Sequence, residues 1–137
     1  MQDIKFSGKN GDCPYFIYED YKFFIQDSKV GSDWKYSLYM KDLKSDTLTF
    51  ATDKEALNYI KSIDRIKYVC SSSNLSLYET IHKDYIINSN KINIKNKPEF
   101  IALEFDSYVE CLKFAKKYVA EFIRKHERQI SIKGVLD

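Results

Sequence analysis

One pattern, a strand that leads into a capped helix, occurs twice in the chain and constrains its fold more than any other feature. Residues 48–59 align without gaps on residues 103–114. In each copy, alternating apolar residues precede a hydroxyl residue, Thr52 or Ser107, and a glutamate follows three positions later. This spacing is typical of a helix N-terminus, because the hydroxyl and the carboxylate can satisfy backbone N–H groups of the first turn. The sequence therefore predicts two strand-to-helix junctions.

Apolar residues at helical spacing follow both junctions and predict a helix after each. The first helix is expected from Asp53 to about Ile63, and the second, the longest element, from Ser107 to about His126. The expected buried residues are Ala56, Leu57 and Ile60 in the first helix and Leu112, Ala115, Val119 and Phe122 in the second.

Alternation of side-chain character predicts a strand over residues 34–41. Its core-facing residues would be Trp34, Tyr36, Leu38 and Met40. A turn at residues 43–46 would return the chain into a strand at residues 47–51, so that the two strands form a hairpin feeding the first helix.

Aromatic-rich segments at residues 15–18 and 21–26 predict two further strands, joined at Glu19 and Asp20. Other expected elements include short strands over residues 4–6 and 66–70, a loop over residues 28–33 and a short helix passing into a strand over residues 75–87. A strand over residues 100–105 and an edge strand over residues 130–132 are also expected.

These elements predict an α+β fold, with an antiparallel β-sheet and two main helices packed on one of its faces. Duplicated strand-hairpin-helix halves, about residues 13–70 and 71–132, would share one core, because half a chain of this size would struggle to bury both faces of its elements. We expect residues 1–137 to form a single domain.

The charge balance and the motifs favour a binding protein over an enzyme. A net charge of +2 is too small to predict nucleic-acid binding by charge alone. The glycines at positions 8, 11, 31 and 134 do not form a nucleotide-binding fingerprint, and the sequence contains no nucleophile elbow. We therefore expect a protein that is not an enzyme and has no cofactor.

Cysteine and histidine usage indicates packing roles rather than a metal site. Cys13, Cys70 and Cys111 lie far apart, so neither zinc binding nor a disulfide framework is expected. Cys111 falls on the apolar side of the second helix, and His126 lies near the end of that helix, where a structural role is expected. The sequence shows no signal peptide and no apolar run of membrane length, which favours a soluble, cytoplasmic protein without a membrane partner.

Aromatic and basic residues interleave on the second face of the early strands. If residues 34–41 turn Tyr36 and Leu38 toward the core, alternation places other side chains on the opposite face. These candidate partner-binding residues are Lys22, Phe24, Lys35, Tyr39 and Lys41. An open sheet face of this composition can anchor a protein partner or stack nucleic-acid bases.

A second candidate surface is basic and lies on the outward side of the second helix. Lys113, Lys117, Arg124 and Arg128 recur there, interrupted by Glu110, Glu121 and Glu127. Such a face could steer an anionic partner, although a solvated helix face has the same pattern.

Residues 34–60, a strand, a turn and a strand that ends in Phe50-Ala51-Thr52-Asp53-Lys54-Glu55-Ala56, resemble the three-stranded arm-binding domains of phage integrases. Those domains are similar to plant AP2 modules, so the resemblance implies a sheet face that enters the DNA major groove. It covers about a fifth of the chain, and Asp33, Asp42 and Asp46 interrupt the expected basic face.

Three functional hypotheses follow. The leading one is a small non-enzymatic protein that occupies a surface on a larger protein, such as a phage or mobile-element inhibitor of a host defence system of the CRISPR nuclease type. The alternatives are a nucleic-acid-binding domain that uses the aromatic and basic sheet face, and a binder of a small anionic metabolite or nucleotide in a cleft between the halves. The oligomeric state is open, with a homodimer among the alternatives.

Overall fold

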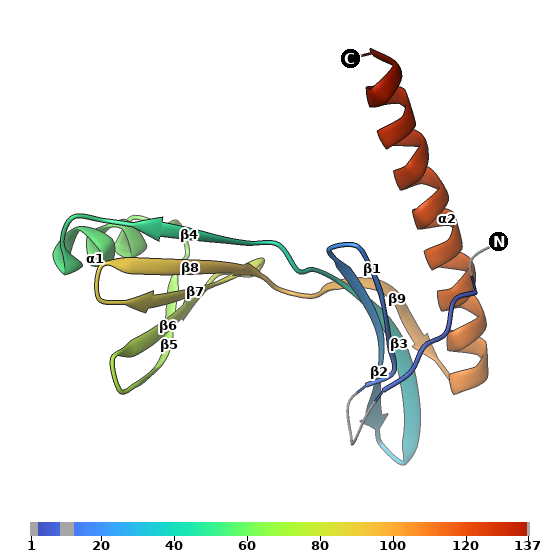
Figure 1. Ribbon diagram of the computed structural model, residues 1–137. Helices are drawn as coiled ribbons and strands as arrows, with labels where there is room; N and C mark the ends of the chain where they lie inside the picture. The colour runs from blue at the N-terminus through green and yellow to red at the C-terminus, as the bar shows by residue number, and fades with distance from the viewer. Residues whose placement is uncertain (1–2, 9–12, 137) are drawn as a thin grey trace. The chain divides into compact units, whose positions relative to one another are not determined.

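The computed structural model (Figure 1) describes residues 3–8 and 13–136, with side chains except at Leu103 and residues 130–136. The fold is α+β and antiparallel, as predicted. The strands are β1 (Tyr15–Tyr18), β2 (Tyr21–Val30), β3 (Asp33–Asp42), β4 (Ser45–Thr49), β5 (Lys67–Ser72), β6 (Leu75–Glu79), β7 (Lys83–Asn88), β8 (Lys91–Asn96) and β9 (Glu99–Phe105). The helices are α1 (Asp53–Lys61) and α2 (Tyr108–Leu136).

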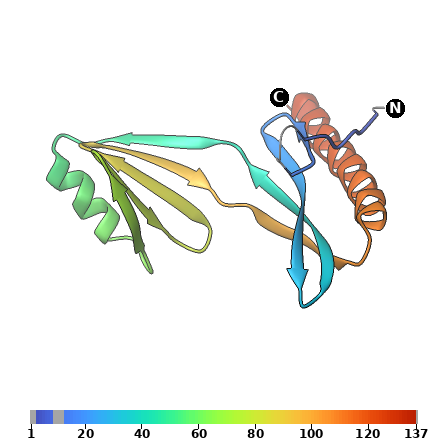
Figure 2. The same cartoon turned by 90° about the horizontal axis from the view of Figure 1, so that it is seen from below.

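The elements belong to two compact units. The first unit combines Met1–Met40 with Phe100–Asp137, and the second consists of Lys41–Glu99. The first holds a four-stranded sheet in the order β1-β2-β3-β9 together with α2, and the second holds a five-stranded sheet in the order β4-β8-β7-β6-β5 together with α1 (Figure 2). The expectation of two helices on one face of one sheet was therefore wrong, because each helix accompanies its own sheet.

The core of the first unit lies between its sheet and α2. Phe23, Ile25 and Leu38 point from β2 and β3 toward the helix. The helix contributes a stripe with a spacing of four residues, Cys111, Ala115, Val119 and Ile123, all of which are buried. This spacing keeps the side chains on one side of the helix.

The second unit has a separate core, so the predicted shared core is wrong. Ala56 and Ile60 of α1 pack against Tyr85 and Ile87 of β7 and Ile92 of β8. The boundary between the predicted halves, at residues 70 and 71, falls inside β5 and not between the units. The prediction of a single domain stays a prediction.

Both predicted strand-to-helix junctions are confirmed. The chain passes from β4 into α1 and from β9 into α2. Thr52 Oγ1 accepts a hydrogen bond from the Glu55 backbone N–H at 3.1 Å, and Ser107 Oγ accepts one from the Glu110 N–H at 3.4 Å. Each hydroxyl therefore satisfies a backbone donor that has no partner within the helix.

The predicted hairpin of residues 34–41 and 47–51 does not form, because β3 and β4 lie in different sheets. β4 pairs instead with β8, where Leu48 lies opposite Ile92. Burial of that apolar pair in the second core outweighs the proximity of β3 in sequence. The three-stranded arrangement implied by the resemblance to integrase arm-binding domains is therefore not present.

Other local predictions also changed. Residues 75–87 form β6 and β7 rather than a helix and a strand, because Tyr78 pairs with Tyr85 on the core side. The predicted loop over residues 28–33 is mostly strand, with a tight turn at Gly31, whose φ of +66° suits glycine. Residues 130–132 belong to α2 and not to an edge strand. Trp34, predicted to face the core, is 51% exposed at the start of β3.

Candidate functional site

The main candidate site is the face of the first sheet that points away from its core. Side chains alternate along β2, so Phe23 and Ile25 enter the core while Lys22 and Phe24 point to the opposite face. In β3 the same alternation buries Leu38 and turns Tyr39 outward. Lys22, Phe24 and Tyr39 therefore lie on one face of the sheet, as the alternation in the sequence predicts.

Aromatic rings form a connected row across this face. Phe24 and Tyr39 are stacked, with ring centroids 5.2 Å apart and 10° between the ring planes. Tyr39 also meets Phe100 of β9 edge to face at 4.9 Å. On the other side, Tyr15 of β1 pairs in register with Phe24. The row therefore includes one ring from each of the four strands.

Lys22 adds a positive charge to the row. Its ammonium nitrogen lies 4.9 Å from the centroid of the Tyr15 ring and 5.8 Å from that of Phe24. Both distances fall within the range of cation–π attraction. We call Tyr15, Lys22, Phe24, Tyr39 and Phe100 the aromatic face. Phe100 is 46% exposed, and the neighbouring Ile17, paired with Lys22 in register, is 48% exposed.

Lys35 and Lys41, also predicted for this face, lie on β3 at positions with the same alternation as Tyr39. Lys35 forms an ion pair and hydrogen bond with Asp106. That hydrogen bond raises the pKa of the Lys35 ammonium group above its ordinary value. The pair borders an open pocket of about 370 Å³ that is also lined by Asp33, Trp34 and Tyr36. Lys41 belongs to the second unit.

Sequence reasoning missed Tyr15 and Phe100. Tyr15 could have been found, because a two-residue turn at Glu19 and Asp20 fixes Tyr18 opposite Tyr21 and hence Tyr15 opposite Phe24. Phe100 could not have been found, because β9 lies beside β3 in the sheet whereas strands β4 to β8 come between them in the sequence. No local pattern predicts that neighbour.

The basic surface of α2 is exposed as predicted. Lys113, Lys117, Arg124 and Arg128 are all exposed, and their spacing keeps them on neighbouring turns. Glutamates lie between them in sequence at positions 110, 121 and 127.

His126 and Cys111 have packing roles. His126 Nε2 lies 2.9 Å from Glu19 Oε2, and its ring stacks on Phe122 and meets Tyr18 and Tyr21 edge to face. The Cys111 side chain is fully buried, and burial raises the pKa of its thiol to about 11. A thiol with so high a pKa is a poor nucleophile at neutral pH.

The part of the chain that the structure describes contains no group of three or more histidine, cysteine, aspartate or glutamate residues that could hold a metal ion. Neither α1 nor α2 combines the length and the apolar composition needed to cross a membrane. Comparisons with protein-family models, with curated proteins and with solved structures found no match to this chain.

Proposed function

We propose that the protein is a non-enzymatic binding protein whose aromatic face docks on the surface of a larger protein. The observation that carries this proposal is the connected row of rings on the outward side of a four-stranded sheet. Tyrosine and phenylalanine provide large contact areas with little loss of conformational entropy, and such anchors dominate many protein interfaces.

Ring geometry favours a protein partner over stacked nucleic-acid bases. Phe24 and Tyr39 already cover part of each other's faces at an interplanar angle of 10°, and Tyr39 receives Phe100 edge to face. A base that stacks on a sheet needs a free ring face. The row instead offers ring edges and the apolar side chain of Ile17, which suit the side chains of a protein surface.

The charge on this face also supports a protein partner. Lys22 is the single basic residue of the aromatic face, and its ammonium group already lies over two rings. Nucleic-acid affinity comes largely from several cation–phosphate contacts. Within this proposal, an inhibitor of a host defence nuclease remains the partner class that we predict for a small chain of this kind.

Affinity purification tests the proposal. The tagged chain would be recovered, with nuclease treatment, from a lysate of the organism that encodes it, beside a Tyr39→Ala/Phe100→Ala variant and a Trp34→Ala control. Trp34 is an exposed aromatic residue of the same sheet outside the aromatic face. We expect a stoichiometric protein to accompany the wild type and the control but not the double variant. A partner retained equally by all three would contradict the proposal.

A further inference from the structure

Cationic side chains gather at one end of the second sheet, in the unit that does not carry the aromatic face. Strand registers place Lys67 opposite Glu79, Glu79 opposite Asp84, Asp84 opposite Lys95, and Lys95 opposite Ser45. These residues form one row across all five strands, from β5 to β4. Residues in register share a face of the sheet, so the charges of the row face the same way.

A pocket of about 300 Å³ lies at the β4 side of this row. Lys41, Lys44 and Lys95 contribute three positive charges to its lining, and Asp42 contributes one negative charge. The Asp42 carboxylate accepts the Lys44 backbone N–H at 3.0 Å, and the Asn96 amide donates to the carbonyls of Asp42 and Lys44 at 3.4 and 3.2 Å. These bonds fix the turn that carries Lys44.

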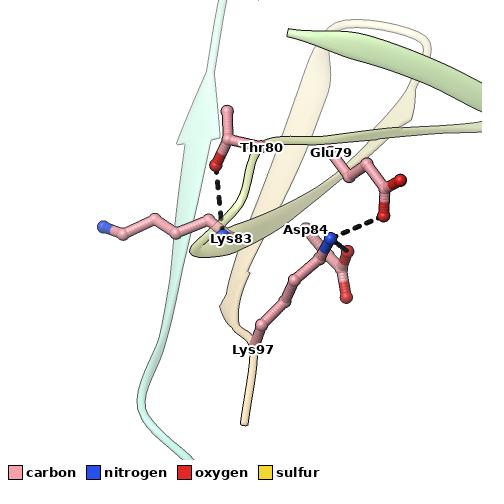
Figure 3. Close-up of polar contacts among 5 residues, drawn as sticks. All are labelled: Glu79, Thr80, Lys83, Asp84 and Lys97. Atoms are coloured by element: carbon pink, nitrogen blue, oxygen red, sulfur yellow. Dashed lines mark hydrogen bonds and ion pairs between the residues drawn. The ribbon is translucent and has the colours of Figure 1, made fainter. Parts of the chain in front are cut away.

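A second pocket, of about 250 Å³, lies at the β5 side and is lined by Arg65, Lys67 and Lys97 together with Glu79, Thr80 and Ile81. Figure 3 shows the Lys97 ammonium group between two carboxylates, 2.6 Å from Glu79 and 3.8 Å from Asp84. The two negative charges of the row, on Glu79 and Asp84, are therefore paired with a cation of the protein. This pairing also fixes the Lys97 side chain at the pocket.

The lip of the second pocket offers a hydroxyl and an apolar side chain. Thr80 Oγ1 accepts the Lys83 backbone N–H at 3.1 Å (Figure 3), so its own hydrogen remains available to donate to a ligand oxygen. Ile81 is 75% exposed at the same turn. An apolar side chain between cationic groups suits contact with a sugar or a base beside a phosphate.

We propose that the cations lining the two pockets bind the phosphate backbone of a nucleic acid. These cations are Lys41, Lys44, Arg65, Lys67, Lys95 and Lys97. Four carboxylates lie near these six cations: Lys97 pairs with Glu79 and Asp84, Arg65 lies 3.9 Å from Asp64, and Asp42 accepts the Lys44 backbone N–H. The six cations therefore exceed the carboxylates by two charges. The excess of positive charge matches a polyanion. This site lies in the second unit and does not depend on the aromatic face or on its partner.

The spread of the row favours a nucleic acid over a single nucleotide. Four inter-strand spacings separate β5 from β4 in the sheet order, which corresponds to roughly 19 Å. One strand of a duplex places about five phosphates over that length. An isolated phosphate can occupy only one of the two pockets, whereas a strand can reach both.

Fluorescence anisotropy with labelled 20-residue oligonucleotides tests the site. Double-stranded DNA, single-stranded DNA and single-stranded RNA would each be titrated with the full chain between about 50 and 200 mM salt. The test variant is Lys44→Gln/Lys95→Gln. The control, Lys54→Gln/Lys91→Gln, removes the same charge from the same unit, at α1 and at the other end of the sheet, where Lys91 pairs with Thr49.

We expect at least one oligonucleotide to bind the wild type with an affinity that falls with salt. The test variant should bind about tenfold more weakly at low salt and show a salt slope smaller by about 1.5, since each lost phosphate contact removes about 0.7 to 0.9 from the slope. The control should change less than threefold. Circular dichroism would confirm that both variants are folded.

Three results would overturn the site. The wild type could fail to bind any of the oligonucleotides at the lowest salt concentration. Both double variants could lose the same affinity, which would indicate a general charge effect. ATP or inorganic phosphate could bind as tightly as the oligonucleotides, with the test variant losing that binding, which would indicate a site for a single phosphate group and not for a nucleic acid.

Discussion

Phe24 on β2 and Tyr39 on β3 stack on the outward face of the first sheet, with 5.2 Å between their ring centroids and 10° between their planes. Neither ring belongs to the core on the other side of the same strands. Aromatic pairs on neighbouring strands stabilise a sheet, but Tyr39 also connects this pair to the half-exposed Phe100. The pair therefore forms the middle of a surface and is the natural centre of an interface.

Truncation of Tyr39 should weaken partner binding without unfolding the chain. Tyr39→Ala removes the ring that joins Phe24 to Phe100, and truncation of a central aromatic anchor typically costs about 2 kcal/mol or more of binding free energy. Tyr39→Phe keeps the ring and should retain most of the affinity. Titration calorimetry with the isolated partner checks both variants, and equal affinity of Tyr39→Ala and wild type would remove Tyr39 from the interface.

The two cores should respond separately to mutation. Ile60→Ala leaves a cavity in the second core and should cost about 2 to 5 kcal/mol there. Trp34, the single tryptophan, lies in the first unit. In urea, the fluorescence transition of Trp34 should stay at its wild-type midpoint in this variant, while circular dichroism shows an earlier loss of structure. A matching shift of the fluorescence midpoint would show that the units unfold together.

The helix caps should make measurable contributions to stability. Thr52→Ala removes the acceptor of the Glu55 N–H, and Ser107→Ala removes that of the Glu110 N–H. Each substitution should cost about 0.5 to 2 kcal/mol of unfolding free energy. Thr52→Ser and Ser107→Thr keep the hydroxyl and serve as controls in the same urea titration. Controls as unstable as the alanine variants would argue against the caps as the cause.

The second unit should become less stable in acid, because Glu79 becomes protonated there. The hydrogen bond from Lys97 lowers the pKa of the Glu79 carboxyl below its ordinary value of 4.5. A lowered pKa in the folded state stabilises the fold above pH 4.5, and this contribution is lost as the pH falls through the folded-state pKa. Lys97→Met also removes the cation that lies between Glu79 and Asp84, which are opposite each other in register.

The Lys97→Met variant should therefore be less stable than wild type at pH 7, and the difference should shrink toward pH 3. Urea midpoints by circular dichroism at pH 7, 5 and 3 measure this trend. Lys91→Met, at the other end of the sheet, controls for the loss of a lysine. A difference that stays constant with pH would show that Lys97 acts through packing and not through the carboxylates.

Thiol reactivity should separate the cysteines. Cys70 is exposed on β5, whereas Cys111 is fully buried with a thiol pKa of about 11. At pH 8 a disulfide reagent should modify Cys70 within minutes and Cys111 only as the first unit unfolds. Cys13, of intermediate exposure, is replaced by serine throughout, so that Cys70→Ser removes the fast phase and identifies it. Fast modification of Cys111 in the folded chain would contradict its place in the core.

Local signals in the sequence predicted much of the fold. The hydroxyl and glutamate spacing at Thr52 and Ser107 located both helices, because a cap depends on residues only three positions apart. The alternation in residues 34–41 correctly assigned Leu38 and Tyr39 to opposite faces. The end of α2 was missed because Ile130 and Ile132 suit a strand as well as a helix when only two apolar residues are considered.

Long-range pairing could not be predicted in this way. From the sequence alone, Leu48 could have paired within a β3-β4 hairpin. In the folded sheet it lies opposite the apolar Ile92, and this match favours pairing of β4 with β8. For the same reason, the sequence did not predict that Phe100 lies on the candidate face. Lys35 follows the alternation of its strand, but its partner Asp106 could not be predicted, because it lies 71 positions away. Such choices depend on which strands meet in three dimensions.

Site-specific photo-crosslinking tests the central claim most directly. Benzoylphenylalanine would replace Tyr39 on the aromatic face, Trp34 elsewhere on the same sheet, or Tyr59 on α1 of the second unit, all in the full chain expressed in the organism that encodes it. If the aromatic face docks on a protein, illumination should attach one protein to the chain through position 39 and far less through positions 34 and 59. Equal labelling at the three positions, or no protein adduct at position 39 while the chain remains folded, would contradict the proposed function.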